Sequence, residues 1–345
     1  MIDARRIITV GVDCSKLMGG VSAVEIEYSR IYNPWRHVAT STSGSSIKKL
    51  CYFITGLIKF LYLMIVCPSI EIVHIHGASY YSFWRKRTIV SIAKAFKKKV
   101  VYHCHGAEFK LFTSSHRDVV VKMLHKCDRV VCLSESWKQW FEQECGCENV
   151  VIIKNIISEP QLRDVPRKNN NCLKMLFLGE LGKRKGIYDL LDVIAELKEH
   201  DIQLYCGGNG DVDGVLNRVK DLKIEDKFKY LGWVGGDSKI DLLNKCDVFV
   251  LPSYNEGLPI SVLEAMSYGM PIVSSKVGGI PEIVLNGENG FLIEPGDKKD
   301  LCDALLKLKD DQSLRRVMGE KSKMLSLPHQ PIYVEKQLQE MYNSI

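Results

Sequence analysis

The sequence lacks the features that mark several other classes of protein. It has no low-complexity tract, and with 46% hydrophobic and 26% charged residues over 345 positions its composition excludes a disordered chain. Its one closely spaced cysteine pair, Cys145 and Cys147, has no second pair at zinc-finger spacing, so we expect no metal there. The first residues read as a strand and not as a signal peptide, and the 12 cysteines are scattered, which predicts reduced thiols in the cytoplasm.

Two common nucleotide-binding motifs are also missing. No Gly-Lys-Ser/Thr tripeptide is present, which excludes a Walker A loop. No G-x-G-x-x-G followed by an acid about 20 residues later is present, which argues against a nicotinamide dehydrogenase. No motif for sequence-specific nucleic-acid binding is found either, so we expect no nucleic-acid partner.

Short apolar runs alternate with helical segments along the chain, and the pattern restarts after the Pro- and Asn-rich stretch 158–171. Apolar runs separated by amphipathic segments are typical of parallel sheets covered by helices. We therefore predict an α/β protein with two Rossmann-like, doubly wound domains, at 1–157 and 172–325, facing each other across a cleft. The terminal helix, 331–345, is left open, and packing on the first domain is one option.

The charge is unevenly distributed between the two halves. Residues 1–155 hold 22 Lys/Arg against 12 Asp/Glu, whereas the remainder holds 25 against 29. The first half therefore favours an anionic partner, such as a membrane surface, a phosphorylated lipid or nucleic acid. A basic face that is merely solvated is the alternative.

One apolar segment is long enough to raise the question of whether it crosses or contacts a membrane. Residues 50–66, LCYFITGLIKFLYLMIV, are short for a spanning helix and are interrupted by Lys59. Two readings stay open: a core helix of the first domain, or a helix lying on an anionic membrane, supported by the nearby stretches YYSFWRKR and KAFKKK. The second reading predicts a cytoplasmic protein held peripherally on the inner face of the cell membrane.

Two glycine-containing loops are candidates for phosphate binding. Gly19 and Gly20 follow the first strand and precede a helix, where backbone N–H groups can face an anion, although a tight turn explains them equally well. In the second half, FLGELGKRKGIYDLL places Lys183, Arg184 and Lys185 among glycines between a strand and a helix. This arrangement predicts a basic phosphate site at a helix N-terminus.

Histidines and an Asp-x-Asp raise the question of a metal. His105 ends a strand and could bond a phosphate or hydroxyl, or exchange protons near neutral pH. His74 and His76 share one strand face, as do His103 and His105, but the two pairs meet only if their strands are neighbours in register. The loop 207–214, GGNGDVDG, reads more simply as a strand-to-helix connection than as a metal site. We therefore expect no metal.

Two glutamates eight residues apart, Glu256 and Glu264, frame the start of a helix. A strand ends at Ser253, Pro259 suits the first helical position, and the helix stops at Gly269. Carboxylates beside an anion-binding helix end are unfavourable unless they accept hydrogen bonds from hydroxyl groups. Two acids flanking a diphosphate site therefore suggest a sugar nucleotide, with one acid on the sugar and the other on the ribose.

With these residues in place, the sequence resembles the retaining glycosyltransferases of family 4, which have the GT-B fold. Glu256 and Glu264 match that family's E-x7-E motif within NEGLPISVLEAMSYGMPIVSSKVGGIPEIVLNGENGFLIEPGD. The similarity includes GELGKRKG and extends more loosely to MGGV and HCHG in the first half. The resemblance implies a first domain that binds the acceptor and a second that binds the donor.

The resemblance also implies a role for each site residue. Glu256 would bind the donor sugar, Glu264 the ribose, Lys185 with Arg184 the departing diphosphate, and His105 the sugar and acceptor. Further donor contacts are implied for Gly19, Gly20, Gly257, Leu258 and, in the loop beside the base, Val234.

The implied reaction is transfer from a UDP- or GDP-sugar to a glycan or a polyprenyl-diphosphate-linked glycan, without a metal or cofactor. A bacterial pathway for capsule, O-antigen or exopolysaccharide fits this chemistry. One departure from the family pattern is Glu180, where many members have arginine, and another is the missing glycine after Asn155. Glu180 keeps a second reading open, that of a non-catalytic homologue that binds nucleotide sugars or carbohydrate.

Overall fold

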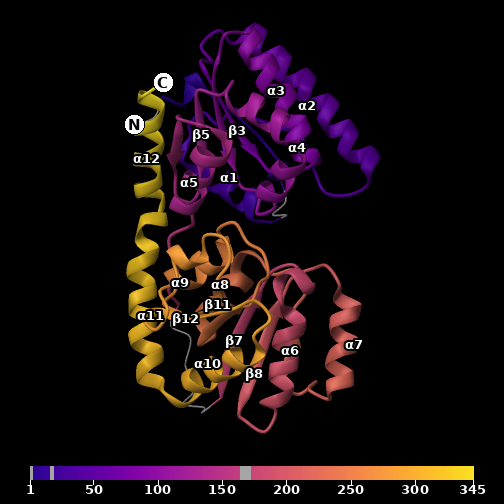
Figure 1. Ribbon diagram of the computed structural model, residues 1–345, viewed down its shortest axis with the longest axis vertical. Helices are drawn as coiled ribbons and strands as arrows, with labels where there is room; N and C mark the ends of the chain where they lie inside the picture. The colour runs from indigo at the N-terminus through magenta and orange to yellow at the C-terminus, as the bar shows by residue number, and fades with distance from the viewer. Residues whose placement is uncertain (1–2, 16–18, 164–171) are drawn as a thin grey trace. The chain divides into compact units, whose positions relative to one another are not determined.

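The chain folds into two compact units, each built around its own parallel sheet (Figure 1). The computed structural model describes residues 3–15, 19–163 and 172–345. The first unit comprises residues 1–158 together with 328–345, and the second comprises residues 159–327. Residues 164–171 of the predicted linker lie outside the described part of the chain.

Within the described residues, six parallel strands form the sheet of the first unit, in the order β2-β1-β3-β4-β5-β6. Its strands are β1 (Ile7–Gly11), β2 (His37–Ala39), β3 (Ile72–Gly77), β4 (Lys99–Cys104), β5 (Arg129–Cys132) and β6 (Val150–Ile152). Its helices are η1 (Ala4–Arg6), α1 (Gly20–Ile31), α2 (Ser46–Val66), α3 (Tyr81–Ala95), α4 (Phe109–Leu124), α5 (Glu135–Cys145) and α12 (Pro331–Asn343), the last preceded by η4 (Leu327–His329).

The strand order of the first unit reverses next to β1. The chain moves outward from β1 to β2 and then returns past β1 to β3, so right-handed crossovers put α1 and α2 on opposite faces of the sheet. The C-terminal helix α12 packs against α1, where the hydroxyl groups of Tyr32 and Tyr342 lie 2.7 Å apart in a buried hydrogen bond.

The second unit has the same construction, again with six parallel strands among the described residues, in the order β12-β11-β10-β7-β8-β9. Its strands are β7 (Leu173–Leu178), β8 (Ile202–Gly207), β9 (Phe228–Tyr230), β10 (Val248–Leu251), β11 (Ile272–Ser275) and β12 (Gly290–Ile293). Its helices are η2 (Lys183–Lys185), α6 (Ile187–Glu196), α7 (Val212–Leu222), α8 (Gly236–Lys245), α9 (Ile260–Ser267), η3 (Ile280–Glu282), α10 (Lys298–Asp310) and α11 (Gln312–Ser326). The predicted fold class, two doubly wound parallel sheets with flanking helices, is confirmed.

The apolar segment 50–66 belongs to α2, and the reading as a core helix is wrong. The helix begins earlier, at Ser46, where the Ser45 side chain accepts a hydrogen bond from the Lys48 N–H. It is long and apolar enough to cross a membrane by composition, yet only 17% of its most apolar window is buried. Its buried residues are Gly56, Phe60 and Met64, so α2 contacts the unit along one narrow face.

Candidate active site

The central strands of the second sheet, β7 and β10, place the predicted donor residues at one edge. β7 leads into the loop that carries η2, and β10 leads into the loop before α9. β7 and β10 are neighbours in the sheet, and the chain continues in opposite directions from them, to β8 on one side and to β11 on the other. Such a switch point, at the carboxyl ends of the strands, is where open α/β sheets bind their ligands.

Glu256 lies in the loop between β10 and α9, and only 5% of its surface is exposed. Pro259 has an extended backbone and precedes the helix, which begins at Ile260, so the prediction that Pro259 is the first helical residue is off by one position. The predicted stop at Gly269 agrees with the structure, because this glycine follows the helix with a φ of 76°.

Lys185 and Glu256 form a direct ion pair. Lys185 Nζ lies 2.5 Å from Glu256 Oε1, and the two side chains are 14% and 6% exposed. Ser253 Oγ donates a second hydrogen bond, of 2.7 Å, to the same carboxylate oxygen. The end of η2 is therefore tied to the loop after β10, and a largely buried carboxylate is balanced by one cation and one hydroxyl.

Arg184 makes different contacts from its neighbour Lys185. Its Nη2 lies 2.8 Å from Glu180 Oε2, and its Nη1 donates to the carbonyl of Asn255. Glu180, which stands at a position where an arginine is expected, thus pairs with Arg184. Because both partners are more than a third exposed, the pair contributes about 1 kcal/mol or less to stability. Arg184 remains close enough to the surface to exchange Glu180 for a ligand phosphate.

Glu264 lies on α9, and its carboxylate pairs with Lys239 on α8. Lys239 Nζ lies 2.6 Å from Glu264 Oε1, with side chains 20% and 17% exposed. Val234, in the loop before α8, packs against the end of β8, since a Cβ on Gly207 would lie 2.6 Å from Val234 Cγ2. The loop predicted to lie beside the base therefore contacts the same edge of the sheet.

A second loop supports Glu256 from behind. Gly278 has a φ of 56°, and a Cβ there would lie 1.9 Å from the Glu256 carbonyl oxygen. The next residue, Gly279, donates its N–H to the carbonyl of Gly257 at 2.7 Å. The backbone at Glu256 and Gly257 is therefore fixed by a loop that only glycine allows to approach so closely.

We expect Gly278→Ala to destabilise the second unit by more than about 2 kcal/mol, because a strained φ and a backbone clash act together. The control is Gly287→Ala, which shares a positive φ but meets nothing within 4 Å. That variant should lose only about 1 kcal/mol. Urea unfolding of both variants separates the cost of the strained φ from the cost of the backbone clash. Equal losses of stability in the two variants would show that the contact with Glu256 does not matter.

The end of β1, which precedes the loop of Gly19 and Gly20, contacts two buried ionisable side chains, Glu25 and Lys86. Gly19 is the residue before α1, and Gly20 is its first residue, while residues 16–18 lie outside the described part of the chain. Glu25, on α1, accepts the N–H of Val12, and a Cβ on Gly11 would collide with its carboxylate. Lys86 donates to the Gly11 carbonyl at 2.8 Å, and burial lowers the pKa of Lys86 to about 7.

The four histidines that lie on β3 and on β4 or directly after it do meet, because the two strands are paired with His76 opposite His103. His76 Nδ1 lies 2.9 Å from His105 Nε2, and His74 Nε2 lies 3.2 Å from His103 Nδ1. His74 Nδ1 also hydrogen-bonds the hydroxyl of Tyr342 on α12. Ring nitrogens of His74, His76 and His103 fall within 4.8 Å of one another, a spacing that a metal could use. The rings bond one another and Tyr342, whereas Nε2 of His76 and Nε2 of His103 are buried with no hydrogen-bond partner among the described residues.

Desolvation changes the chemistry expected of His105. Burial lowers the pKa of His105 to about 3. The ring is therefore neutral at neutral pH, and the expected proton exchange in that range is not supported. With Nε2 bonded to His76, His105 retains Nδ1 as a neutral group for a ligand hydroxyl.

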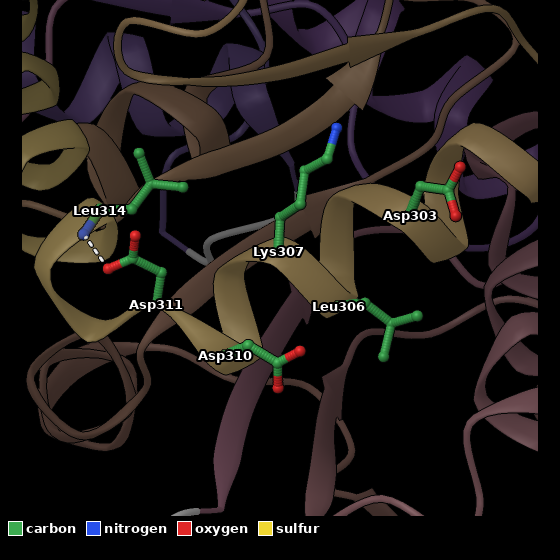
Figure 2. A pocket seen from close by; sticks show the side chains of 6 residues that line it. All are labelled: Asp303, Leu306, Lys307, Asp310, Asp311 and Leu314. Carbon is green, nitrogen blue, oxygen red and sulfur yellow. Dashed lines mark hydrogen bonds between the residues drawn. The ribbon is translucent and has the colours of Figure 1, made fainter.

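A surface hollow lies elsewhere on the second unit, where α10 meets α11. Figure 2 shows its lining side chains, which are Asp303, Leu306, Lys307, Asp310, Asp311 and Leu314. Asp311 caps α11 by accepting the Leu314 N–H at 2.8 Å. The hollow contains none of the predicted site residues, and the joint between two helices explains it.

Several residues of the site were not predicted from the sequence. Lys239, Ser253, Glu25 and Lys86 have no motif of their own, and only their contacts identify them. Asp211 of the Asp-x-Asp caps α7 by accepting the Gly214 N–H, which agrees with a plain loop.

Comparison with known proteins agrees with this architecture. The model of "Glycosyl transferases group 1" matches residues 158–324, and that of "Glycosyltransferase Family 4" matches residues 24–159. The N-acetyl-alpha-D-glucosaminyl L-malate synthase of Bacillus anthracis is 27% identical over 268 residues, which are 74% of this chain and 69% of that protein. The phosphatidyl-myo-inositol mannosyltransferase of Mycobacterium leprae is 28% identical over 263 residues, 73% of this chain and 67% of that protein.

Other relatives are matched over a smaller share of their length, and a solved structure is matched over its whole length. The chain spans 54% and 64% of the lengths of two other curated relatives, both from Methanocaldococcus jannaschii. Among solved structures, Anabaena HepE in complex with UDP and glucose has a TM-score of 0.80 at 18% identity, covering 99% of this chain and 100% of that one. Since the two family models adjoin and together cover residues 24–324, the chain belongs to the family 4, group 1 glycosyltransferases.

Proposed function

We propose that the chain transfers a sugar from a UDP- or GDP-sugar to a glycan or lipid-linked glycan, with retention at the anomeric carbon and without a metal. The observation that carries the proposal is the Lys185–Glu256 ion pair at the switch point of the second sheet. It supports the proposal because a cation and a carboxylate at a switch point are suited to bind a diphosphate and its sugar.

Lys185 supplies the charge stabilisation that the reaction needs. Breaking the bond between the sugar C1 and the β-phosphate oxygen leaves a nucleoside diphosphate with one more negative charge. Lys185 has three N–H donors, and one bonds Glu256, so others remain for phosphate oxygens. Arg184 can join it by releasing the exposed Glu180. Fixed cations in a shielded site stabilise developing charge without reorganisation.

Glu256 binds the sugar and need not act as a nucleophile. In the proposed step the acceptor oxygen attacks C1 on the face that the phosphate leaves, and the departing phosphate oxygen takes the acceptor's proton. The C1–phosphate bond breaks as the new C1–oxygen bond forms, through an oxocarbenium-like transition state. Glu256, held by Lys185 and Ser253, accepts hydrogen bonds from sugar hydroxyls, and Glu264 does the same for the ribose.

The acceptor assignment rests on charge and on the relatives. The mannosyltransferase of Mycobacterium leprae is named for a phosphatidyl-linked acceptor, and HepE was crystallised with UDP. A lipid-linked glycan at the cytoplasmic face of a bacterial membrane fits the excess of basic residues in the first half of this chain. Capsule, O-antigen or exopolysaccharide synthesis is the corresponding pathway. The roles of Gly19, Gly20 and His105 stay predictions.

A non-catalytic nucleotide-sugar or carbohydrate-binding protein is the second candidate. The Glu180–Arg184 pair favours it, because it occupies a cation that would otherwise meet the diphosphate. It would bind the donor through Glu256 and Glu264 without releasing free nucleotide.

A panel of sugar nucleotides separates these candidates. We expect one UDP- or GDP-sugar to raise the melting temperature and to be hydrolysed slowly in the absence of acceptor, with and without a chelator. Stabilisation without hydrolysis or transfer would favour the binding protein. If no sugar nucleotide stabilises the protein, the donor assignment fails.

A further inference from the structure

An exposed apolar stripe runs the length of α2. Its residues recur every three or four positions, which puts them on one side of a helix. They are Ile47, Leu50, Ile54, Ile58, Tyr62 and Ile65. Exposure is high, at 76% for Ile47, 62% for Ile58 and 69% for Ile65. At about 1.5 Å per residue the 21-residue helix presents a stripe roughly 30 Å long, and large exposed apolar patches mark interaction sites.

The opposite side of α2 fixes the helix to the first unit. A Cβ on Gly56 would lie 2.3 Å from the carbonyl oxygen of Ala39, so the helix backbone rests directly on β2. Phe60 is fully buried, and Lys59 Nζ donates to the carbonyl of His37 at 2.9 Å. To cross a bilayer α2 would have to abandon these contacts. The helix is therefore held lengthwise on the unit with its stripe facing outward.

The surroundings of the stripe are basic. Between Ser46 and Ala95, which includes α2 and α3, the sequence contains one acid, Glu71, and that residue is paired with Arg6. The same segment contains the basic residues Lys48, Lys49, Lys59, Arg85, Lys86, Arg87 and Lys94. Of these, Lys86 is buried and Lys94 pairs with Asp128, so the others supply the surface charge. An apolar stripe bordered by cations matches the headgroup region of an anionic bilayer.

Exposed aromatic side chains also lie at the start of α3, a helix that contacts α2. Tyr80, Tyr81 and Trp84 are 44%, 83% and 38% exposed. Arg87 lies over the Trp84 ring, 5.6 Å from its centroid. Rings with one apolar body and one polar edge favour the boundary between headgroups and acyl chains.

We propose that α2 and the start of α3 dock the chain on an anionic lipid bilayer, with α2 lying parallel to the surface and its stripe inserted among the upper acyl segments. A second copy of the chain is the other occupant to consider, but two such faces would bring their lysines together without an acid between them. The docking proposal rests on the proposed function in one respect only: docking would bring the first unit to a lipid-linked acceptor.

The test is co-sedimentation with vesicles of phosphatidylglycerol and phosphatidylcholine at low salt. We expect wild type to bind, and Ile54→Glu/Ile58→Glu to bind at least about tenfold more weakly. The matched control is Val317→Glu/Met324→Glu, which adds the same two charges at exposed positions of α11 in the second unit. It should bind like wild type, because its changes lie off the stripe.

Three outcomes would overturn the docking proposal: no binding of wild type, equal losses in both variants, or a dimer in solution that is abolished only by the α2 substitutions and does not bind vesicles. Melting temperatures show that both variants fold. Stabilisation by a sugar nucleotide is measured alongside, in the absence of lipid. If it persists while vesicle binding fails, only the docking proposal falls; if vesicles bind and no sugar nucleotide stabilises the protein, only the proposed function falls.

Discussion

Lys185→Ala should reduce sugar transfer by about a hundredfold to a thousandfold, chiefly through kcat. Removing one preorganised group that stabilises transition-state charge typically costs that much. Lys185 is suited to this role because it is 14% exposed and already fixed by Glu256, so its ammonium group is in place before the phosphate leaves. Turnover is measured as nucleoside diphosphate released with acceptor present.

Glu256→Gln should also lose most of the transfer activity, for a different reason. The amide keeps the shape and one acceptor oxygen, but it leaves Lys185 without its counter-charge and weakens the hydrogen bonds to sugar hydroxyls. Glu264→Gln offers a comparison within the same motif. Its carboxylate pairs with Lys239 and is assigned to the ribose, so its loss should raise the KM for the donor more than it lowers kcat.

The matched control for Lys185→Ala is Lys183→Ala, an exposed cation on the same short helix η2. It should retain near wild-type turnover if position, and not overall charge, is what matters. Lys185→Ala also removes the partner of a largely buried carboxylate, a change that costs about 3–5 kcal/mol when a pair is fully buried. Folding is therefore checked by urea unfolding, and the pair Lys185→Met/Glu256→Gln serves as a folded inactive variant. Wild-type turnover from Lys185→Ala would refute its role.

The main features of the fold could be predicted from local patterns. Apolar runs of strand length, each followed by a helix, are sufficient for two parallel sheets. The same pattern predicts that Lys185 and Glu256 follow strands and that Glu264 lies on a helix, as the structure has them. Their partners could not be predicted. Lys239 reaches Glu264 because α8 and α9 lie close together, which is a consequence of packing across 25 positions of sequence.

The same limit explains why the sequence leaves two readings of α2 open. Its composition fits a buried helix, a surface helix or a membrane span, because hydrophobicity alone does not determine which face of the helix is buried by the rest of the protein. The deciding contact is between Gly56 and the backbone of Ala39, where the absence of a side chain lets the helix rest on an edge strand. The histidine cluster was equally undecided, since it depends on the register that sets His76 beside His103.

Acid should unfold the first unit well before the second, as a result of its buried histidines. Burial lowers the pKa of His74 and His105 to about 3 and of His329 to about 4, and it holds the pKa values of His76 and His103 well below normal. In the unfolded chain each would titrate near 6.5. Below that pH the unfolded state binds more protons than the folded state, so stability is fully present above about pH 6.5 and falls as the pH approaches 3.

The expected size of this effect is large. Each histidine that stays neutral in the folded state costs about 1.4 kcal/mol of stability per pH unit below 6.5, so several acting together remove a few kcal/mol by about pH 5.5. Calorimetry between about pH 7.5 and about pH 5.5 should show the transition of the first unit moving to lower temperature. His103→Gln should make this dependence less steep by removing the contribution of one of the five histidines, because the amide does not titrate, while keeping an acceptor for the histidine beside it. His200→Gln, at a partly exposed position in the second unit, is the control and should leave the slope unchanged. A melting temperature that stays constant over this range would mean that the buried rings do not control acid stability, and their cluster would then need another explanation, such as a bound metal that already fixes the rings.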